Sequence, residues 1–540
     1  MHSEIFLFVA LLIIALVSFL GIISDISKQF SFETPAYGGL LKEGVIGAPR
    51  FINPILAQTD ADRDLVALMY TGLLRYDETG VPQPALAEKY EISQDGLEYK
   101  VTLKNKLYWS DGEKLTADDV IFTIGLAKNP QLLSPRRASW EGVGVEKQDD
   151  STILFLLKKP YAPFPENLTL GIIPEHIWKN VLISQFPLVG LNINPVGNGP
   201  YKLKSVSKDS MGSAESVVLE ANKYFALGRP NIKNIEVKFY RNEQNIVSDL
   251  KNGLIDSAGG ISPKYAEDLI KTSGQKTNIK SISLQRIIAV FLNQSLMKDF
   301  ATVNVRNALD MAVDKNALVN NILNSYGETI TGPLPKSIFA NSASGTPENA
   351  GFDLYAAQKL LAKQKEPVAF TLTTAEIPEL TATAEMLKDM WSKAGVSVDI
   401  KTFNLNDLEQ LVIGPRRYEA FLYGEEIIGQ TPDPFAFWHS SQRAHPGYNI
   451  ALYANAKVDN LLENVRSTQD AEERTKIYAD IQTEIIKDMP AIFLFSPSYI
   501  YAMPSDLGGM DTKNISTGSE RFSAVYKWYL EKHYVWNIFK

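Results

Sequence analysis

The chain has 540 residues, more than one hydrophobic core usually supports, so two or three domains are expected. Its 54 Lys and Arg and 62 Asp and Glu give a formal net charge of −8 without a basic stripe, which argues against nucleic acid as a partner. The sequence has no cysteine, which excludes disulfides, thiolate nucleophiles, the usual structural zinc sites and a lipid-modified cysteine.

An apolar run, IFLFVALLIIALVSFLGII, occupies residues 5–23. A helix of this length, at about 1.5 Å per residue, extends roughly 28 Å and can cross a bilayer core. The start, Met1-His2-Ser3-Glu4, has no basic residue and no A-x-A pattern follows, so an uncleaved membrane anchor is favoured over a cleaved signal peptide. Only Lys28 flanks the run, so charge says little about orientation. Residues 24–36 are interpreted as a polar linker.

Strand and helix patterns alternate from residue 37 onward, which is typical of an α/β protein. Apolar residues at alternate positions predict strands at 99–103 and 235–240. A short apolar run predicts a buried strand at 153–157. Because the side chains of a capping box satisfy the first amides of a helix, Thr116-Ala-Asp-Asp119 predicts that a helix begins there.

The second half of the chain carries clearer helix patterns. Residues 305–313 place apolar side chains on one stripe, and Asp314 is suited to cap a second helix that ends near Leu323. Isoleucines at four-residue spacing predict an amphipathic helix at 472–487. This helix should end at Met489-Pro490, before a return strand at 491–495.

No arrangement of residues typical of catalysis is present. The sequence contains no G-x-S-x-G elbow, Walker A sequence or G-x-G-x-x-G fingerprint. His439 and His445 lie six apart on a segment broken by Pro446, so they lack the spacing of a zinc helix. Gly197-Asn-Gly199 precedes a proline and is interpreted as a tight turn. We therefore expect no catalytic residue, metal or cofactor.

Aromatic residues are abundant, with 23 Tyr, 25 Phe and 7 Trp. Most aromatic side chains fill hydrophobic cores, but those at 418–426 and 433–438 lie among charged residues. An aromatic wall with a few fixed charges suits a cleft for a zwitterionic ligand with variable side chains.

Short fragments in a fixed order resemble a known family over nearly the whole chain after the apolar run. The family is that of the extracellular solute-binding proteins of family 5, of the oligopeptide, dipeptide and nickel type. Each fragment alone is weak, and the order of the series carries the resemblance. The fragments are 72–77, 84–88, 93–96, 109–120, 195–201, 305–314, 353–361 and 432–434, followed by Asn449, Asp459 and the helix from Glu473 to Pro490.

The resemblance implies an α/β, two-lobed periplasmic-binding-protein-like fold (class II, cluster C type), whose lobes close on a ligand about two crossovers near 288–296 and 488–496. Residues 1–36 would form the membrane anchor and linker. Lobe 1 would comprise 37–65, 197–290 and 493–540, with 66–196 as an inserted subdomain, and lobe 2 would comprise 291–492.

The sequence departs from the family at the position that binds the ligand's amino group. Peptide-binding members carry a Trp and then an Asp shortly before the P-D-P-like segment, whereas this chain reads from Tyr423 through Glu425, Glu426 and Gln430 to Pro434. Either glutamate is a candidate replacement, and both are equally open to interpretation as solvated loop charges. The resemblance and the aromatic segments together give these candidate ligand-binding residues: Asp60, Tyr423, Glu425, Glu426, Gln430, Asp433, Phe435, Trp438, Asn449 and Phe495.

The resemblance further implies a monomeric, non-enzymatic binding component of an ABC importer, anchored in the cell membrane with its binding domain outside the cytoplasm, either periplasmic or extracellular. Its partners would be a peptide or peptide-like solute and the membrane permease subunits, with no nucleic acid. A ligand sensor of the same fold without a transporter is the alternative, and a surface hydrolase is disfavoured.

Overall fold

The computed structural model describes residues 31–272, 276–339, 351–427, 429 and 431–536, together with isolated positions between residues 6 and 19. Apart from these positions, the predicted membrane anchor at 5–23 lies outside the described residues. Within the described part of the chain, no helix combines the length and the apolar character that a membrane crossing needs.

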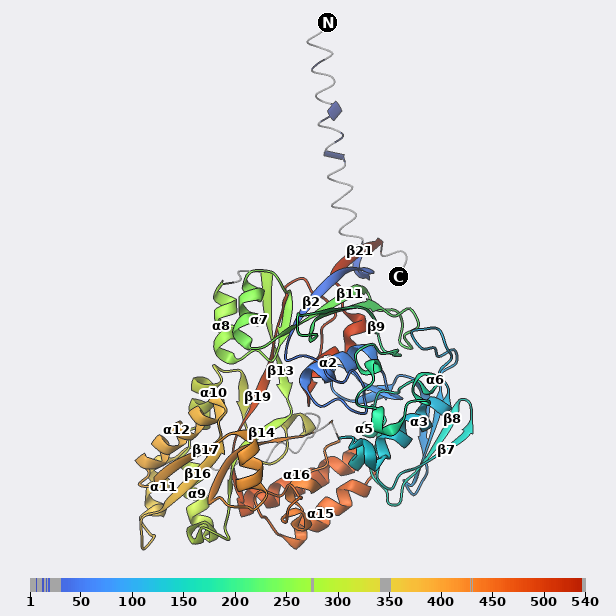
Figure 1. Cartoon of the computed structure of the whole chain (residues 1–540). Helices are drawn as coiled ribbons and strands as arrows, with labels where there is room; N and C mark the ends of the chain where they lie inside the picture. The colour runs from blue at the N-terminus through green and yellow to red at the C-terminus, as the bar shows by residue number, and fades with distance from the viewer. Residues whose placement is uncertain are drawn as a thin grey trace.

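One sheet of 13 strands runs through both halves of the molecule (Figure 1). Its strands are β2 (Gly38–Ile46), β9 (Tyr201–Lys208), β10 (Ala214–Ala221), β11 (Ile232–Tyr240), β12 (Ser257–Gly259), β13 (Thr277–Leu284), β14 (Arg286–Leu292), β15 (Gly327–Thr329), β16 (Ala369–Ala375), β17 (Ser397–Phe403), β18 (Ala420–Glu426), β19 (Ala491–Pro504) and β20 (Asn514–Ile515). The main path is β17-β16-β18-β14-β19-β12-β2-β11-β10-β9. Strands β11 and β19 confirm the predictions at 235–240 and 491–495.

Strand β19 links the two halves. Its first half pairs with β14 and β15, and its second half pairs with β12 and β13. The chain also passes between the halves at Gln285, which separates β13 from β14. We call the half built on the core residues between 287 and 495 lobe 2, and the other half lobe 1. The two passages lie side by side, because the Ser496 hydroxyl donates to the Leu284 carbonyl at 2.8 Å.

A small antiparallel sheet forms a separate layer beside lobe 1, with the strand order β5-β6-β8-β7. Its strands β6 and β8 confirm the predictions at 99–103 and 153–157. The predicted capping box is present as well, because the Thr116 amide donates to Asp119 at 2.9 Å at the start of α3. We call residues 73–172 the small-sheet unit. Its main elements are β5 (Ala87–Ile92), β6 (Glu98–Leu103), α3 (Ala117–Lys128), α4 (Arg137–Trp140), β7 (Gly144–Asp149), β8 (Thr152–Leu156) and α5 (Phe164–Asn167).

The predicted helices of the second half are confirmed. Asp314 caps α10 by accepting from the Ala317 amide at 3.0 Å, and the isoleucine stripe at 472–487 lies in α16 with its apolar side buried. The remaining elements used below, and the main helices of both lobes, are β3 (Leu74–Tyr76), β4 (Pro82–Pro84), α2 (Asp60–Met69), α7 (Glu243–Lys251), α8 (Pro263–Thr272), α9 (Val303–Met311), α10 (Lys315–Ile322), α11 (Leu354–Leu361), α12 (Pro378–Lys393), α14 (Phe435–Trp438), α15 (Ala456–Ser467), α16 (Ala471–Asp488) and the 3-10 helix η9 (Gly518–Lys527).

Lobe 2 and the small-sheet unit each have a hydrophobic core of their own, and lobe 1 has two. The main core of lobe 1 adjoins a buried ionic cluster in which the Arg521 guanidinium contacts Glu43 at 2.8 Å and Asp64 at 2.7 Å. This cluster ties η9 to β2 and α2, because each of its three side chains comes from a different one of these elements.

The glycine pair at 197 and 199 marks a close backbone contact. A Cβ at Gly199 would lie 2.4 Å from the Met69 carbonyl carbon, so a larger residue does not fit. Between the glycines, the Asn198 side chain accepts from the Thr71 amide at 2.8 Å and donates to the Thr71 carbonyl at 3.0 Å. The segment from Gly197 to Gly199 is therefore held against the end of α2.

Candidate functional site

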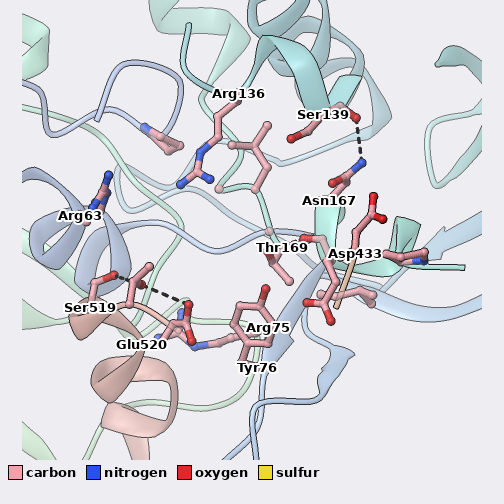
Figure 2. A pocket seen from close by; sticks show the side chains of 18 of the residues that line it. Arg63, Arg75, Tyr76, Arg136, Ser139, Asn167, Thr169, Asp433, Ser519 and Glu520 are labelled. Atoms are coloured by element: carbon pink, nitrogen blue, oxygen red, sulfur yellow. Dashed lines mark hydrogen bonds between the residues drawn. The ribbon is translucent and has the colours of Figure 1, made fainter. Parts of the chain in front are cut away.

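A cavity of about 640 Å³ lies where lobe 1, lobe 2 and the small-sheet unit meet. Its walls come from α2 and β3, from residues 136–171, from residues 426–448 with Arg466, and from η9. Figure 2 shows that the labelled side chains point into this space from several sides. Arginines and carboxylates line it in equal numbers: Arg63, Arg75, Arg136 and Arg466, and Glu166, Glu426, Asp433 and Glu520.

Contacts between lobe 2 and the small-sheet unit close the cavity on one side. The Tyr161 hydroxyl donates to Asp433 Oδ2 at 3.1 Å, and Arg466 Nη2 lies 3.1 Å from the same oxygen. The Arg466 guanidinium also lies over the Phe435 ring, 4.4 Å from its centroid. A backbone bond from the Ala162 amide to the Arg466 carbonyl, 2.6 Å long, joins the same two parts. The structure is therefore a conformation in which the lobes contact each other.

Glu426 reaches the cavity from the end of β18. It pairs with Arg286 of β14 at 3.1 Å, and both side chains are partly exposed. The two residues are direct cross-strand partners, while the preceding Glu425 is opposite Ile287. Since successive side chains of a strand point to opposite faces, only one of the two glutamates can face the cavity.

Glu520 lines the cavity from η9. Its carboxylate accepts from the Ser516 amide at 2.8 Å and from the Thr517 hydroxyl at 3.1 Å. Burial raises the pKa of Glu520 to about 7, and these two hydrogen bonds offset only part of the rise. Near neutral pH this side chain is therefore divided between its charged and neutral forms.

Arg75 is a half-buried cation that is held by backbone carbonyl groups. Its guanidinium donates to the carbonyls of Ser523 at 2.6 Å, Phe522 at 2.8 Å and Ala67 at 3.2 Å, and to the Thr71 hydroxyl at 3.0 Å. Burial lowers the pKa of Arg75 to about 10, so it stays charged at neutral pH. These hydrogen bonds are made to other groups of the protein, so Arg75 connects β3 with η9.

The predicted ligand-binding residues are spread over several environments. Glu426 and Asp433 line the cavity. Phe435 and Tyr423 are not among the lining residues: Phe435 lies under the Arg466 guanidinium, and Tyr423 is partly buried and stacks on Phe421 with ring centroids 5.1 Å apart. Gln430 lies outside the described residues.

Besides Tyr423 and Phe435, five further predicted residues do not line the cavity. Asp60 is exposed at the start of α2, where it pairs with Arg63 at 3.3 Å. The others are buried: Glu425 and Trp438 lie in lobe 2, Asn449 bonds the carbonyls of His439 and Tyr453, and Phe495 pairs with β14. Buried aromatic and amide side chains usually serve packing and hydrogen bonding within the fold, and these four lie away from the cavity walls.

Sequence reasoning did not single out the arginines or Glu520. Arg75 lies in the fragment 72–77, which was used only as a scaffold mark. Arg136 and Arg466 occur in segments without any local pattern that indicates a site. No group of three or more His, Asp or Glu side chains in the described ranges is placed to hold a metal ion.

Comparison with known proteins identifies the family and the fold of this chain. The family model described as bacterial extracellular solute-binding proteins, family 5 Middle, matches residues 81–449. The oligopeptide-binding protein AppA of Bacillus subtilis (strain 168) is 28% identical over 507 residues, which cover 90% of this chain and 91% of AppA. The structure of AppA in complex with a nonapeptide matches with a TM-score of 0.71 and 26% identity, covering 92% of this chain and all of that one.

Two further solved structures are similar. The ABC transporter substrate-binding protein CtaP from Listeria monocytogenes has a TM-score of 0.79 and 27% identity, covering 92% of this chain and 100% of CtaP. NikZ from Campylobacter jejuni, solved in complex with Ni(L-His), has a TM-score of 0.71 and 28% identity, covering 91% of this chain and 99% of NikZ. The match extends over both lobes, so the fold is the cluster C fold of periplasmic binding proteins.

Proposed function

Because the chain belongs to the bacterial extracellular solute-binding proteins of family 5, we propose that it captures a peptide or peptide-like solute between its lobes and delivers it to an ABC importer. The family consists of binding proteins, and the chain is accordingly a binding component that acts outside the cytoplasm, not an enzyme.

The observation that carries the proposal is the cavity between the lobes. Lobe 1, lobe 2 and the small-sheet unit all contribute side chains to it, and Tyr161, Asp433 and Arg466 hold its walls together. A solute that contacts both lobes favours the closed conformation, because it binds that conformation more tightly than the open one. The paired passages at Gln285 and Ser496 are the natural positions for the hinge.

The charges and the size of the cavity favour a short peptide. A volume of about 640 Å³ falls in the range typical of small-ligand pockets, about 300–1,000 Å³. Carboxylates and arginines on its walls can pair with the amino and carboxyl groups of a zwitterion. No histidine is among the residues that line it in the described part of the chain, which favours a peptide over a nickel–histidine complex like that bound to NikZ.

We also propose a membrane anchor, a monomeric state, permease partners and domain boundaries for this protein. Residues 5–23 would anchor the protein in the cell membrane, and the protein would act as a monomer with permease subunits as its membrane partners. The proposed boundaries remain 37–65, 197–290 and 493–540 for lobe 1, 66–196 for its inserted subdomain, and 291–492 for lobe 2.

Ligand binding should raise the thermal midpoint of the protein without its first 30 residues. At a peptide concentration about 100 times the Kd, mass action stabilises the native state by about 2.7 kcal/mol, which corresponds to a shift of a few degrees. Differential scanning fluorimetry against a random library of di- to pentapeptides measures the shift. An unchanged midpoint across the library, together with no peptide retained in mass spectrometry, would contradict the proposal.

Glu426 is proposed to pair with the ligand's amino group. We expect Glu426→Gln to weaken binding of peptides with a free amino group about tenfold or more, because a charge-assisted hydrogen bond becomes a neutral one. Binding of the same peptides after N-acetylation should change little, since they lack the ammonium group. Calorimetric titration of both forms makes the comparison, and equal losses for both forms would show that Glu426 is not the partner of the amine.

A further inference from the structure

Two segments that are far apart in the sequence pair in a ribbon on lobe 1. Strand β1 (Ser31–Ala36), which forms the last six residues of the segment interpreted as a linker, pairs antiparallel with β21 (Glu531–Trp536). Figure 1 shows the pair at the end of lobe 1 that lies away from lobe 2. A strand of six residues extends about 20 Å, so the ribbon is long enough to act as a spacer.

Both strands of the ribbon continue segments that lobe 1 holds in place. Only Tyr37 separates β1 from β2, which lies inside the large sheet between β11 and β12. Shortly before β21, the Trp528 side chain is buried in the main core of lobe 1. The next residue, Tyr529, exchanges two backbone hydrogen bonds with Gly508, at 2.9 and 3.0 Å. Because both strands leave lobe 1 at fixed points, lobe 1 sets the direction of the ribbon.

Side chains also hold the junction between β1 and β2. The Arg229 guanidinium lies over the Tyr37 ring, 3.7 Å from its centroid, and donates to the Tyr37 hydroxyl. The Gly38 amide donates to the Asn231 carbonyl at 2.9 Å. A Cβ at Gly38 would lie 2.6 Å from the Glu531 carboxylate, so the Glu531 side chain covers the backbone of the junction. These contacts oppose bending of the ribbon against lobe 1.

Polar contacts join the two strands along the ribbon. Lys532 Nζ lies 2.8 Å from Glu33 Oε2, and the Thr34 hydroxyl donates to the His533 carbonyl at 3.3 Å. A two-stranded ribbon is only marginally stable in isolation. Here lobe 1 already brings the two strands together at their base, which removes much of the entropy cost of pairing.

We propose that β1 and β21 form a stiff stalk that holds lobe 1 in one orientation over the membrane, so that the strand at 531–536 is part of the membrane attachment. The inference rests on the anchor at residues 5–23 that belongs to the proposed function. Without β21, residues 24–36 would be a flexible linker of 13 residues, whose end-to-end distance averages about 20 Å and varies widely. With the stalk, lobe 1 keeps its place over the membrane while the lobes close, and lobe 2 is the part that moves.

The test compares three forms of the protein in lipid nanodiscs, each with its apolar run. They are the wild type, a form that ends after Leu530 and lacks β21, and a matched control that ends after Trp536 and keeps β21. Endoproteinase Glu-C is added, and mass spectrometry of the released domain identifies cleavage after Glu33. Because the chain has no cysteine, Ser210→Cys in the exposed turn between β9 and β10 can carry a single fluorophore. Time-resolved energy transfer to labelled lipid then measures the distribution of distances between lobe 1 and the bilayer.

Loss of β21 should accelerate cleavage after Glu33 about tenfold or more, because proteolysis follows the population of the unpaired segment. It should also broaden the distribution of distances, while the form that ends after Trp536 behaves like the wild type. The thermal midpoint should be the same in all three forms, since each retains Trp528 in the core of lobe 1.

Two results would overturn the inference while leaving peptide binding intact. One is an equal rate of cleavage after Glu33 with and without β21, and the other is a distribution of distances that β21 does not narrow. Failure of the wild type to insert into nanodiscs would overturn the proposed anchor and the stalk together. Peptide capture is tested separately by the thermal shift, so its failure in all three forms would contradict the proposed function and not the stalk.

Discussion

Replacing Arg521 by methionine is expected to lower the free energy of unfolding by about 3–5 kcal/mol, the largest loss for any single substitution considered for this chain. Methionine keeps the length and the apolar stem of the side chain and removes only the guanidinium. Because Glu43 and Asp64 are both buried, the substitution leaves two carboxylates without their cation. One remaining oxygen of Glu43 accepts from the Tyr501 hydroxyl at 2.9 Å, which does not compensate a full charge.

The loss should depend on pH in a defined direction. Burial already raises the pKa of Asp64 even though Arg521 lowers it, so removal of Arg521 raises that pKa further. A carboxyl group that is neutral in the native state costs less to bury, so the destabilisation should be largest at neutral pH and smaller near pH 4. Urea unfolding at both pH values measures this difference.

Arg63→Met is the matched control for this prediction. It removes the same group from α2, but its partner Asp60 is largely exposed, so we expect a change of at most about 1 kcal/mol. Arg521→Met should in addition weaken ligand binding, because η9 carries both Arg521 and the cavity residues Ser519 and Glu520. Equal destabilisation by the two substitutions would show that the buried ionic cluster has no special role.

The elements that the sequence predicted correctly are those whose causes lie within a few residues. The capping box at Thr116 and the isoleucine stripe of α16 depend on neighbours three or four positions away, and both are present. The strand at 99–103 is likewise found where side chains alternate. Such patterns report local geometry directly, because helices and strands repeat with fixed periods.

The cavity could not be predicted in the same way, because distant segments build it. Arg136, Arg466 and Glu520 come from three parts of the chain that are far apart in the sequence and meet only in the folded structure. Trp438 and Asn449 lie away from the cavity walls. Both looked like site residues by type, but each satisfies contacts inside lobe 2, where the Asn449 amide bonds three backbone groups.

For Glu425 and Glu426, the register of strand pairing determines which side chain faces the cavity. The sequence placed two acids near the site but did not specify which one faces it. Pairing of β18 with β14 puts Glu426 opposite Arg286 and Glu425 opposite Ile287. One glutamate is therefore placed at the cavity, and the other enters the core of lobe 2 with only 2% of its surface exposed.

Glu425→Gln is expected to make the protein more stable than the wild type at pH 8, but not at pH 5. No hydrogen-bond partner for either carboxylate oxygen of Glu425 is found in the part of the chain that the structure describes. Burial raises the pKa of Glu425 to about 8, and the nearby Trp438 indole offsets only part of this rise. The unfolded chain has the ordinary value of about 4.3, so between these two pH values the native state binds more protons than the unfolded state.

The sign of the effect follows from that proton difference. Wild-type stability should fall as the pH rises from 5 to 8, by about 3–4 kcal/mol from this group alone, and should level off above the native pKa. Glutamine resembles the protonated glutamate in shape and stays neutral, so Glu425→Gln should lose this dependence. The two proteins should be similarly stable at pH 5, and the variant should be more stable at pH 8. Urea unfolding at several pH values, followed by circular dichroism, measures the difference.

Glu385→Gln provides the control, because Glu385 is exposed on α12 and the same substitution there should change stability by no more than about 0.5 kcal/mol at either pH. Parallel pH profiles for the wild type and Glu425→Gln would mean that the carboxylate has a partner or water contact in solution. Diverging profiles would show that an acid next to the cavity is kept neutral by the core. In that case Glu425 serves the core of lobe 2, and Glu426 is the glutamate of β18 that lines the cavity.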